Sequence, residues 1–515
     1  FHAMPAFALD GKNLSLDNLR RLLAPAPPRL SIAAAARRRV AKAARFVGRL
    51  VESDRAVYGI TTGFGRLANV RIEREDLARL QERLVVSHAA GVGALLPEPE
   101  ARLAIAVRAA TLASGHSGVR PETLDALVAL WNEGVTPAIP SQGSVCASGD
   151  LAPLAHIALT LLGKGRASWN GRPMTAASAL RKAGLKPLRL APKEGLALIN
   201  GTSVATAILA RVLVGAQDLV RLADVAAAMS LEALLGTNVP FDPRVHDLRP
   251  HPGQKETAAN MRRLLKGSRI LPSHKHSDHK VQDPYSLRCV PQVHGAARDG
   301  LRFAREVCER ELNAVTDNPI LFVEDGDVIS AGNFHGQHVA LAADVAASAL
   351  CELGAISERR IEQLVNPDLS NLPPFLAEEP GLNSGFMMAQ TTAAALVSEN
   401  KTLAHPAGVD SIPTSANQED HVSMGMWAAR KCRRILENVG NVIAIEFVAA
   451  AQALDFQELK PGRGVAEAHR RLRKSVPHLA RDRYLAKDIE TAAALLLDGT
   501  LLRAAEKGAG RLASF

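Results

Sequence analysis

The tripeptide Ala147-Ser148-Gly149 combines residue types that could build a reactive group from the backbone itself. Read as ordinary local structure, Ser148 or Asp150 would cap the apolar helix that follows, with Pro153 in its first turn. A tight turn, which glycine tolerates, would also bring the Gly149 nitrogen to the Ala147 carbonyl carbon. Loss of water from the ring and from Ser148 would then leave an exocyclic methylidene, a carbon electrophile. A helix N-terminus beside it would stabilise negative charge developing on the ring.

Other side chains in the chain suit hydrogen bonding and anion binding. Tyr58 lies in a loop with three glycines in eight residues, which break any helix there. His88 can donate or accept a hydrogen bond, and Arg288 can hold a carboxylate with a bidentate fork. Taken alone, a histidine is more often structural and an arginine more often belongs to a surface ion pair.

A histidine-rich stretch raises the question of a metal site. His274, His276, Asp278 and His279 follow one another closely, but their spacing matches no zinc motif. We expect a polar loop there and no required metal.

The composition indicates which elements must position these groups. The chain has 515 residues, of which 47% are hydrophobic and only 4% aromatic. Alanine and leucine dominate the long segments, and both favour helix over strand. We therefore expect a mainly α protein built as a bundle of long helices.

Apolar residues recur with helical spacing in several long segments. The stretch 202–235 is the longest uninterrupted pattern, and Gly236 and Pro240 provide its stop. No strong strand alternation appears, and we expect the segment 271–295 to be irregular. Further helices are predicted at 75–87, 119–135, 338–365, 385–404 and 423–456. The chain divides by pattern into a region 5–200 with the reactive tripeptide and active-site loops, a central bundle 201–457 and a helical region 458–515.

Charge and cysteine content bear on partners and location. The net charge is +10, but the basic residues are dispersed among acidic ones and form no nucleic-acid-binding motif. Charged residues interrupt the apolar stretches, so we expect no membrane span. Five scattered cysteines without a CxxC pair favour a reducing compartment, and no export signal opens the chain. We expect a cytoplasmic protein that binds neither nucleic acid nor membrane.

The run 143–156 resembles the signature of the aromatic amino acid ammonia-lyases, whose prosthetic group is 4-methylideneimidazole-5-one (MIO). The resemblance extends over nearly the whole chain from about residue 8. Cys146 departs from the pattern, since histidine-specific members usually have glycine there, and we expect the change to be tolerated. Further blocks match in order at 58–65, 84–93, 198–202, 281–295, 332–339 and 400–424.

Two positions separate the substrates within this family. Histidine-specific members resemble this chain in carrying the pair Ser87-His88, where phenylalanine- and tyrosine-specific members differ. Glu419 also points to histidine, because phenylalanine lyases lack the matching glutamate. Glu419 could stabilise the imidazole or act as a base, although alone it could also be an acid near a helix start.

The resemblance implies roles for the remaining residues. MIO would form from Ala147, Ser148 and Gly149 without a dissociable cofactor. Asn200 would bind the MIO oxygen, or cap the long helix, or both, and Phe334 would wall the pocket. Tyr58 would remove the β-proton, Gln282 and Tyr285 would lie near MIO and the substrate amine, and Arg288 would bind the substrate carboxylate. Tyr58, Ser148, Tyr285 and Glu419 are thus the expected catalytic residues.

The resemblance also implies a fold and an activity. The fold would be the long-helix bundle subunit of the aromatic amino acid lyase (fumarase/aspartase-like) type, in a homotetramer whose sites are each shared by three subunits. The reaction would be non-oxidative deamination of L-histidine to trans-urocanate and ammonia, the first step of histidine degradation. A tyrosine or phenylalanine ammonia-lyase or aminomutase of the same family is the alternative, and an inactive helical scaffold is another.

Overall fold

The computed structural model describes residues 6–515 apart from 54–55, 64, 66–68 and 276–280, and it is mainly α-helical. The chain forms two compact units, each assembled from segments distant in sequence. Unit 1 comprises Phe1–Val214, Arg305–Asp344 and Pro406–Arg430, and unit 2 comprises Gly215–Ala304, Val345–His405 and Lys431–Phe515. The sequence-based division at 200/201 and 457/458 into three contiguous regions stays a prediction.

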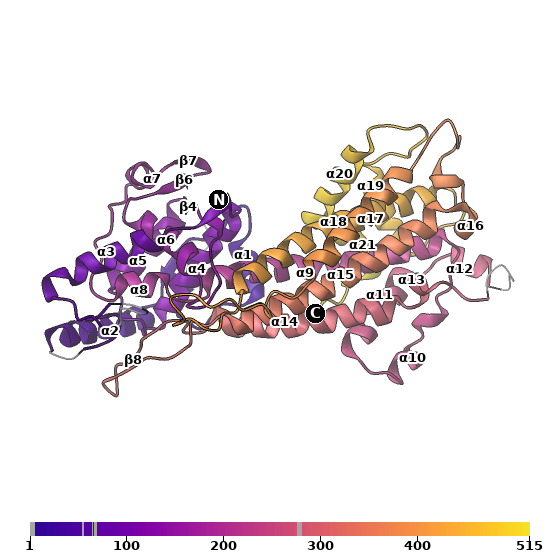
Figure 1. Ribbon diagram of the computed structural model, residues 1–515. Helices are drawn as coiled ribbons and strands as arrows, with labels where there is room; N and C mark the ends of the chain where they lie inside the picture. Colours follow the sequence, from indigo (N-terminus) through magenta and orange to yellow (C-terminus); the bar gives the residue numbers. More distant parts are fainter. Residues whose placement is uncertain (1–5, 54–55, 64, 66–68, 276–280) are drawn as a thin grey trace. The chain divides into compact units, whose positions relative to one another are not determined.

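Unit 1 contains short helices and all the strands of the described chain (Figure 1). Its helices are α1 Leu16–Leu22, α2 Ala34–Glu52, η2 Arg74–Asp76, α3 Leu77–His88, α4 Glu98–Ala113, α5 Pro121–Asn132, α6 Leu151–Leu161, α7 Ala176–Lys182 and α8 Glu194–Ile199. Its strands are β1 Phe7–Leu9, β2 Leu30–Ile32, β3 Val92–Leu95, β4 Val135–Pro137, β5 Pro140–Gln142, β6 Arg166–Trp169, β7 Arg172–Thr175, β8 Ile320–Phe322 and β9 Asp327–Ile329.

The strands form four small sheets. β1 pairs with β2 in parallel, whereas β3–β5, β4–β6–β7 and β8–β9 are antiparallel. In the first sheet Phe7 lies opposite Leu30, and in the last Ile320 lies opposite Ile329. Strands of three or four residues are too short to show a period-two pattern, which explains why the sequence did not predict them.

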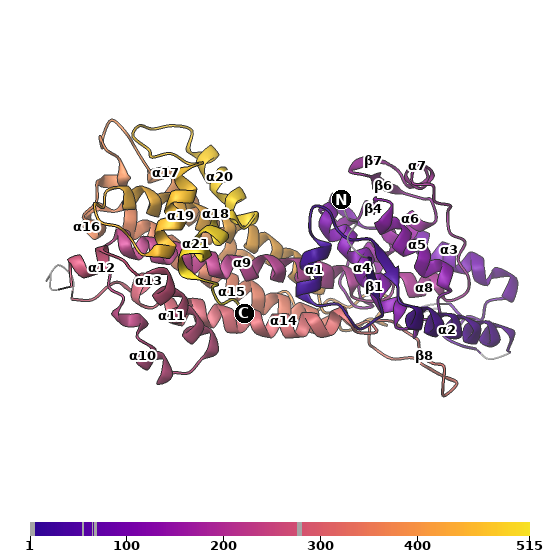
Figure 2. The ribbon, with the colours of Figure 1, turned by 180° about the vertical axis from the view of Figure 1, so that it is seen from behind.

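Four of the five boundaries between the units along the chain fall inside long helices, and the fifth, between His405 and Pro406, falls in a loop. The four helices are α9 Ser203–Ala233, α14 Val290–Leu312, α15 Gln337–Val365 and α18 Gly425–Asp455. Unit 2 adds further helices, and Figure 2 shows them from the other side. They are η3 Val239–Phe241, α10 Pro243–Asp247, α11 Pro252–Leu264, α12 Ile270–Ser273, α13 Tyr285–Arg288, α16 Pro367–Ser370, η4 Pro374–Leu376, α17 Met387–Leu403, α19 Arg463–Arg473, α20 Leu485–Leu497 and α21 Thr500–Ala509.

The long helices predicted from sequence are confirmed to within a few residues. The prediction for 202–235 corresponds to α9, that for 338–365 to α15, and that for 423–456 to α18. The segment 271–295 was expected to be irregular, and this is wrong in part. It contains α13 and the first turns of α14. The sequence pattern did not predict them, because their apolar residues are too sparse to show helical periodicity.

Three of these helices, α9, α15 and α18, are long and apolar enough to cross a membrane by length and composition alone. Between 67% and 83% of the apolar window in each is buried against the chain's own residues. Their apolar surface is therefore protein core. The sequence predicted no membrane span because charged residues interrupt the apolar stretches. These three helices meet the length and composition of a span despite those charges, so the charges alone did not decide the question.

Polar residues inside the helices of unit 2 are buried in pairs. Asp224 of α9 is fully buried and bonds to Arg298 at 2.7 Å and His294 at 2.8 Å. Arg360 of α15 is buried against Glu446 of α18, with a shortest separation of 2.6 Å. A buried ion is costly without a partner, so these pairs specify which helix faces meet.

Candidate active site

A cavity of about 660 Å³ in unit 1 brings together five residues that the sequence indicated separately. Its lining comes from the glycine-rich loop near residue 60, from α3, from the start of α6, from α8 and from a loop before α18. The five residues are Tyr58, His88, Ser148, Asn200 and Glu419.

The burial pattern of helix α3 explains why some of its residues line this cavity. Leu77, Gln81 and Val85 are buried, and they recur at a spacing of four residues along one side. That side packs against α6 and α8. The cavity therefore receives side chains from the adjoining side of α3, including Arg83 and His88.

The backbone at Ser148 makes a tight turn that only glycine permits. Gly149 has φ +71°, and a Cβ there would lie 2.2 Å from the Gly201 carbonyl oxygen. The Asp150 N–H donates to the same oxygen at 2.7 Å. Ala147 and Gly149 are buried whereas Ser148 lines the cavity. This turn fits the compact backbone that cyclisation of the tripeptide requires.

Cys146 also lies in the left-handed region, with φ +56°. That conformation favours glycine and costs other residues about 1–2 kcal/mol. The Cys146 side chain is fully buried, with its Sγ 3.5 Å from Asp150 Oδ1. Burial, followed by the nearby Asp150 charge, raises the pKa of this thiol well above its usual value. The thiol is therefore packed and protonated.

Asp150 caps a different helix from the one expected. It stands at the N-cap of α6, but its side chain accepts no bond within that helix. Its Oδ2 instead accepts from the Val204 and Ala205 N–H groups, both at 2.8 Å, at the start of α9. Burial raises the pKa of Asp150 to about 6, although these backbone bonds oppose the shift. Asp150 thus ties the serine turn to α9.

Glu419 contacts the serine of the tripeptide. Ser148 Oγ donates to Glu419 Oε1 at 2.8 Å, and Thr414 Oγ1 donates to Glu419 Oε2 at 2.6 Å. Thr414 and Glu419 are also paired through their backbones, across the consecutive left-handed residues 415–417. Such strained loops are typical of functional sites. The alternative of a helix-start acid is wrong, since Glu419 lies in a loop and α18 begins only at Gly425.

His88 lies at the end of α3 with its ring orientation set by the backbone. His88 Nδ1 is 2.8 Å from the Leu84 carbonyl oxygen, which can only accept. Nδ1 therefore carries the hydrogen, and in the neutral ring Nε2 is the accepting nitrogen. Ser87 Oγ donates to the same carbonyl at 3.0 Å.

Tyr58 points its phenolic oxygen toward the glycine-rich loop. The Gly65 N–H donates to the Tyr58 hydroxyl oxygen at 3.2 Å. A backbone donor at this position supports negative charge on the oxygen. The half-buried ring lines the same cavity as Ser148.

Asn200 closes α8 and does not cap the long helix, so that part of the expectation is wrong. Its side chain is 3% exposed, and its Oδ1 has no hydrogen-bond partner among the described residues. The buried Arg108 donates to the Ala197 carbonyl oxygen and, at 3.4 Å, to that of Thr316, which holds the end of α8 in place. An unpaired buried amide is costly and is typical of a ligand-binding position.

Four expected site residues do not line this cavity. Gln282, Tyr285 and Arg288 belong to unit 2, where the Arg288 guanidinium stacks 4.6 Å from the centre of the Tyr285 ring. Gln282 is exposed, and Tyr285 is 70% exposed. Phe334 belongs to unit 1 but is a half-buried turn residue outside the lining.

Arg83 is a cavity residue that the sequence reasoning missed. It is exposed on α3 and lies in the lining together with Ser87, four positions later. A spacing of four places two residues on one helix face, so the position of Arg83 relative to Ser87 could have identified it from the sequence. Arg83 adds a cation to a cavity whose other lining residues include apolar side chains, neutral polar ones and one carboxylate, Glu419.

Metal ligands do not gather in the part of the chain that is described, where no group of three or more His, Cys, Asp or Glu residues occurs. His274 Nε2 lies 3.0 Å from the Gly236 carbonyl oxygen. His276, Asp278 and His279 lie outside the described residues.

The helical fold and the serine turn at the start of α6 define a lyase class. The aromatic amino acid lyase profile matches residues 14–474, and the chain belongs to that family. It is 56% identical to a histidine ammonia-lyase of Anaeromyxobacter sp. (strain K) over 97% of this chain and 100% of that protein.

Solved structures agree with this assignment. A histidine ammonia-lyase from Trypanosoma cruzi is 43% identical with a TM-score of 0.91, covering 98% of this chain and 96% of that one. A tyrosine aminomutase from Streptomyces globisporus is 40% identical with a TM-score of 0.92, covering 99% of this chain and 100% of that one. The mainly α lyase fold expected from the sequence is confirmed.

Proposed function

We propose that this chain deaminates L-histidine to trans-urocanate and ammonia. The observation that carries the proposal is the meeting of Ser148, His88 and Glu419 in one cavity. The two residues that indicate histidine thus lie beside the serine expected to be reactive. The histidine ammonia-lyases of Anaeromyxobacter and Trypanosoma cruzi, similar over nearly the full chain, support the same substrate.

Ala147, Ser148 and Gly149 are proposed to form the MIO group. The left-handed turn at Gly149 and the close approach of Gly201 support this, because cyclisation requires a compact backbone. Once formed, MIO supplies an electrophilic carbon that converts the substrate amine into a better leaving group. The buried side-chain amide of Asn200 is suited to hold the MIO oxygen, because its NH2 group can donate to that oxygen.

His88 is proposed to recognise the imidazole ring of the substrate. Its Nδ1–H is bound to Leu84, so Nε2 is the nitrogen that accepts a hydrogen bond from a ring N–H. Phenylalanine has no polar hydrogen on its ring to donate, whereas the tyrosine hydroxyl can donate to the same nitrogen. A site built around such a bond discriminates strongly against substrates that lack it.

Tyr58 is proposed to remove the β-proton at its phenolic oxygen, where the Gly65 N–H would stabilise the phenolate. Glu419 is the alternative base, or it would hold the imidazole. The carboxylate binder is proposed to be Arg288, whose planar guanidinium matches that group.

Arg288, Gln282, Tyr285 and Phe334 are proposed to complete the site from other copies of the chain. The exposure of Gln282 and Tyr285 supports this, because neither side chain is used within its own unit's core. We propose a homotetramer with shared active sites, located in the cytoplasm.

Absorbance assays test the proposal directly. Purified protein incubated with L-histidine should produce urocanate, and Ser148→Ala should produce none above background. Intact mass should show the loss of water expected from cyclisation and dehydration in the wild type only. Coumarate or cinnamate as the preferred product would instead favour a tyrosine or phenylalanine enzyme. A full-mass chain that releases no ammonia would favour an inactive scaffold.

A further inference from the structure

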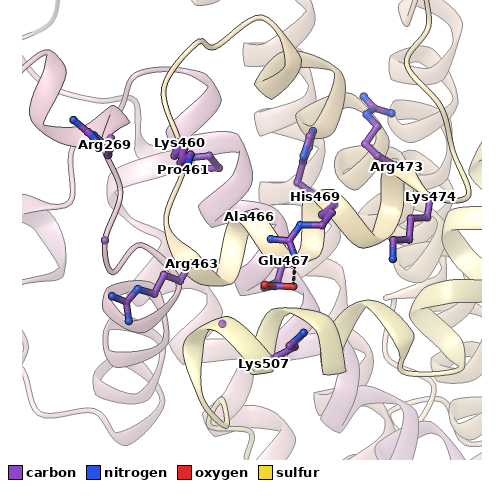
Figure 3. Close-up of a pocket in the computed structure, with 13 residues that line it drawn as sticks. Arg269, Lys460, Pro461, Arg463, Ala466, Glu467, His469, Arg473, Lys474 and Lys507 are labelled. Carbon is purple, nitrogen blue, oxygen red and sulfur yellow. Dashed lines mark hydrogen bonds and ion pairs between the residues drawn. The ribbon is translucent and has the colours of Figure 1, made fainter.

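A second cavity, of about 910 Å³, lies in unit 2 and has a strongly cationic lining. One carboxylate, Glu467, is present among the lining residues, and Figure 3 shows it surrounded by basic side chains. The cationic side chains are Arg269, Lys460, Arg463, Arg470, Arg473, Lys474 and Lys507.

Backbone contacts bring these cations together from separate segments. The Arg269 N–H donates to the Lys460 carbonyl oxygen at 2.9 Å, which ties the residue before α12 to the residues before α19. Helix α21 packs closely on α19, and a Cβ at Gly508 would lie 2.3 Å from the Arg463 carbonyl oxygen. The glycine permits this approach, and Lys507 before it lines the same cavity as Arg463. The cluster is therefore held by the fold.

The carboxylates near the cavity are already occupied. Glu467 accepts from Arg470 at 2.7 Å. Asp455, behind α19, bonds to Arg473 at 2.8 Å and to His469 and His478 at 2.7 Å each. Within the described chain, no carboxylate lies within ion-pair distance of the remaining cations, Arg269, Lys460, Arg463, Lys474 and Lys507.

Arg473 adds a polar atom that lacks a partner. Its Nε is buried and has no hydrogen-bond partner among the described residues. Burial lowers the pKa of Arg473 although Asp455 opposes the shift. Because Asp455 balances the charge of Arg473, the excess positive charge of the cavity lies on the other five cations.

The lining also indicates the class of anion. It contains no Phe, Tyr or Trp, and its one aromatic ring, that of His469, is bonded to Asp455 at 2.7 Å. One carboxylate, as in an amino acid, would neutralise little of the charge. Several negative charges on a compact ligand would meet the lysines and arginines at once, and phosphate oxygens accept well from both. We propose that this cavity binds a small polyanion carrying a chain of phosphate groups.

Titration calorimetry on the assembled protein tests this proposal at constant ionic strength. The probes are sodium tripolyphosphate and ATP, without divalent metal. We expect saturable binding of tripolyphosphate that weakens as salt is raised, because salt screens charge. Equal affinities for the two probes would show that the phosphate chain alone accounts for binding. Tighter binding of ATP would show that the nucleoside also contributes.

Charge reversal assigns the binding to the cavity. Arg463→Glu with Lys507→Glu should weaken tripolyphosphate binding by at least about tenfold. Glutamate suits the first turn of α19, so Arg463→Glu should fold, and Lys460→Gln with Lys507→Gln is a milder second variant. The matched control is Lys186→Glu with Arg189→Glu, two exposed cations of unit 1, and it should bind as the wild type does.

Three results would overturn the proposal. The first is the absence of saturable binding by the wild type. The second is unchanged affinity in both cavity variants, or an equal loss in the control. The third is a single-stranded RNA that binds more tightly than tripolyphosphate, since the surface would then serve a macromolecule. Each readout is binding, so none depends on the proposed deamination.

Discussion

Glu419 Oε1 lies 2.8 Å from Ser148 Oγ, although the two residues are 271 positions apart in the chain. The contact places a carboxylate against the hydroxyl that would leave during dehydration of the tripeptide. It also places that carboxylate in the cavity where the substrate is proposed to bind. Thr414 holds the second oxygen of Glu419, so the orientation is set from both sides.

Glu419→Gln keeps the shape of this contact and removes the negative charge. We expect kcat for histidine to fall by about 10²–10⁴, the usual contribution of a positioned acid or base. The initial rate of urocanate formation measures this, and intact mass reports separately whether the tripeptide still dehydrates. Asp420→Asn, at an exposed neighbour outside the cavity lining, is the control and should retain the wild-type rate. A Glu419→Gln rate within twofold of wild type would exclude a role in catalysis.

Gly149→Ala should prevent dehydration of the tripeptide. The added Cβ would meet the Gly201 carbonyl oxygen at 2.2 Å, so the turn cannot be kept. The expected result is a full-mass chain without urocanate formation, measured by mass spectrometry and absorbance. Gly184→Ala is the matched control, since Gly184 has a similar φ of +70° but no atom within 4 Å of the added Cβ. It should lose about 1–2 kcal/mol of stability from strain and still dehydrate. Normal dehydration of Gly149→Ala would contradict the importance of this turn.

His88→Phe should shift substrate preference. The replacement removes the accepting Nε2 while keeping a ring at the end of α3. We expect kcat/KM for histidine to fall by at least about 100-fold, because the substrate N–H would be left unpaired. Parallel assays with histidine, tyrosine and phenylalanine give the ratio of specificities. Val86→Ala, at an exposed residue of the same helix outside the cavity lining, is the control and should change kcat/KM little. An unchanged preference in His88→Phe would mean that His88 does not contact the substrate ring.

The buried carboxyl of Glu232 should make the free energy of unfolding fall as the pH rises from acidic to neutral values. It is fully buried, and both its oxygens accept from the Gly462 N–H, at 3.0 and 2.9 Å. Burial raises the pKa of Glu232 from 4.5 to about 7, although its hydrogen bonds oppose the shift. The folded state therefore binds more protons than the unfolded state between these values, and stability falls as pH rises from about 4.5 through 7.

Glu232→Gln removes this titration and keeps an acceptor for Gly462. Thermal unfolding at pH 5 and pH 8 should show the variant gaining stability relative to wild type at the higher pH. The gain should be at most about 3 kcal/mol, at 1.36 kcal/mol for each pKa unit. Glu458→Gln, at an exposed residue, should leave the pH dependence unchanged. Parallel stability curves for wild type and Glu232→Gln would show that Glu232 has an ordinary pKa.

The sequence by itself determined the long helices and the residue types at the site. Helical spacing in 202–235 predicted α9, since local periodicity reports which side of a helix is buried. The motif around Ser148 and the pair Ser87-His88 indicated the chemistry before any distances were known. The segment 271–295 was the weakest prediction, because α13 is a single turn without its own periodic pattern.

Only the tertiary structure decided which of these residues meet. Asp150 stands at the start of α6, but its carboxylate caps α9 instead, where it accepts from the N–H of Val204, fifty-four positions later in the chain. Asn200 closes α8 with an unpaired amide, and Glu419 reaches Ser148 from a strained loop. These contacts depend on how distant segments pack, and hydrophobic periodicity carries no information about which polar groups then face one another. For that reason the residue types could be predicted from the sequence, while the partners of each polar group could not.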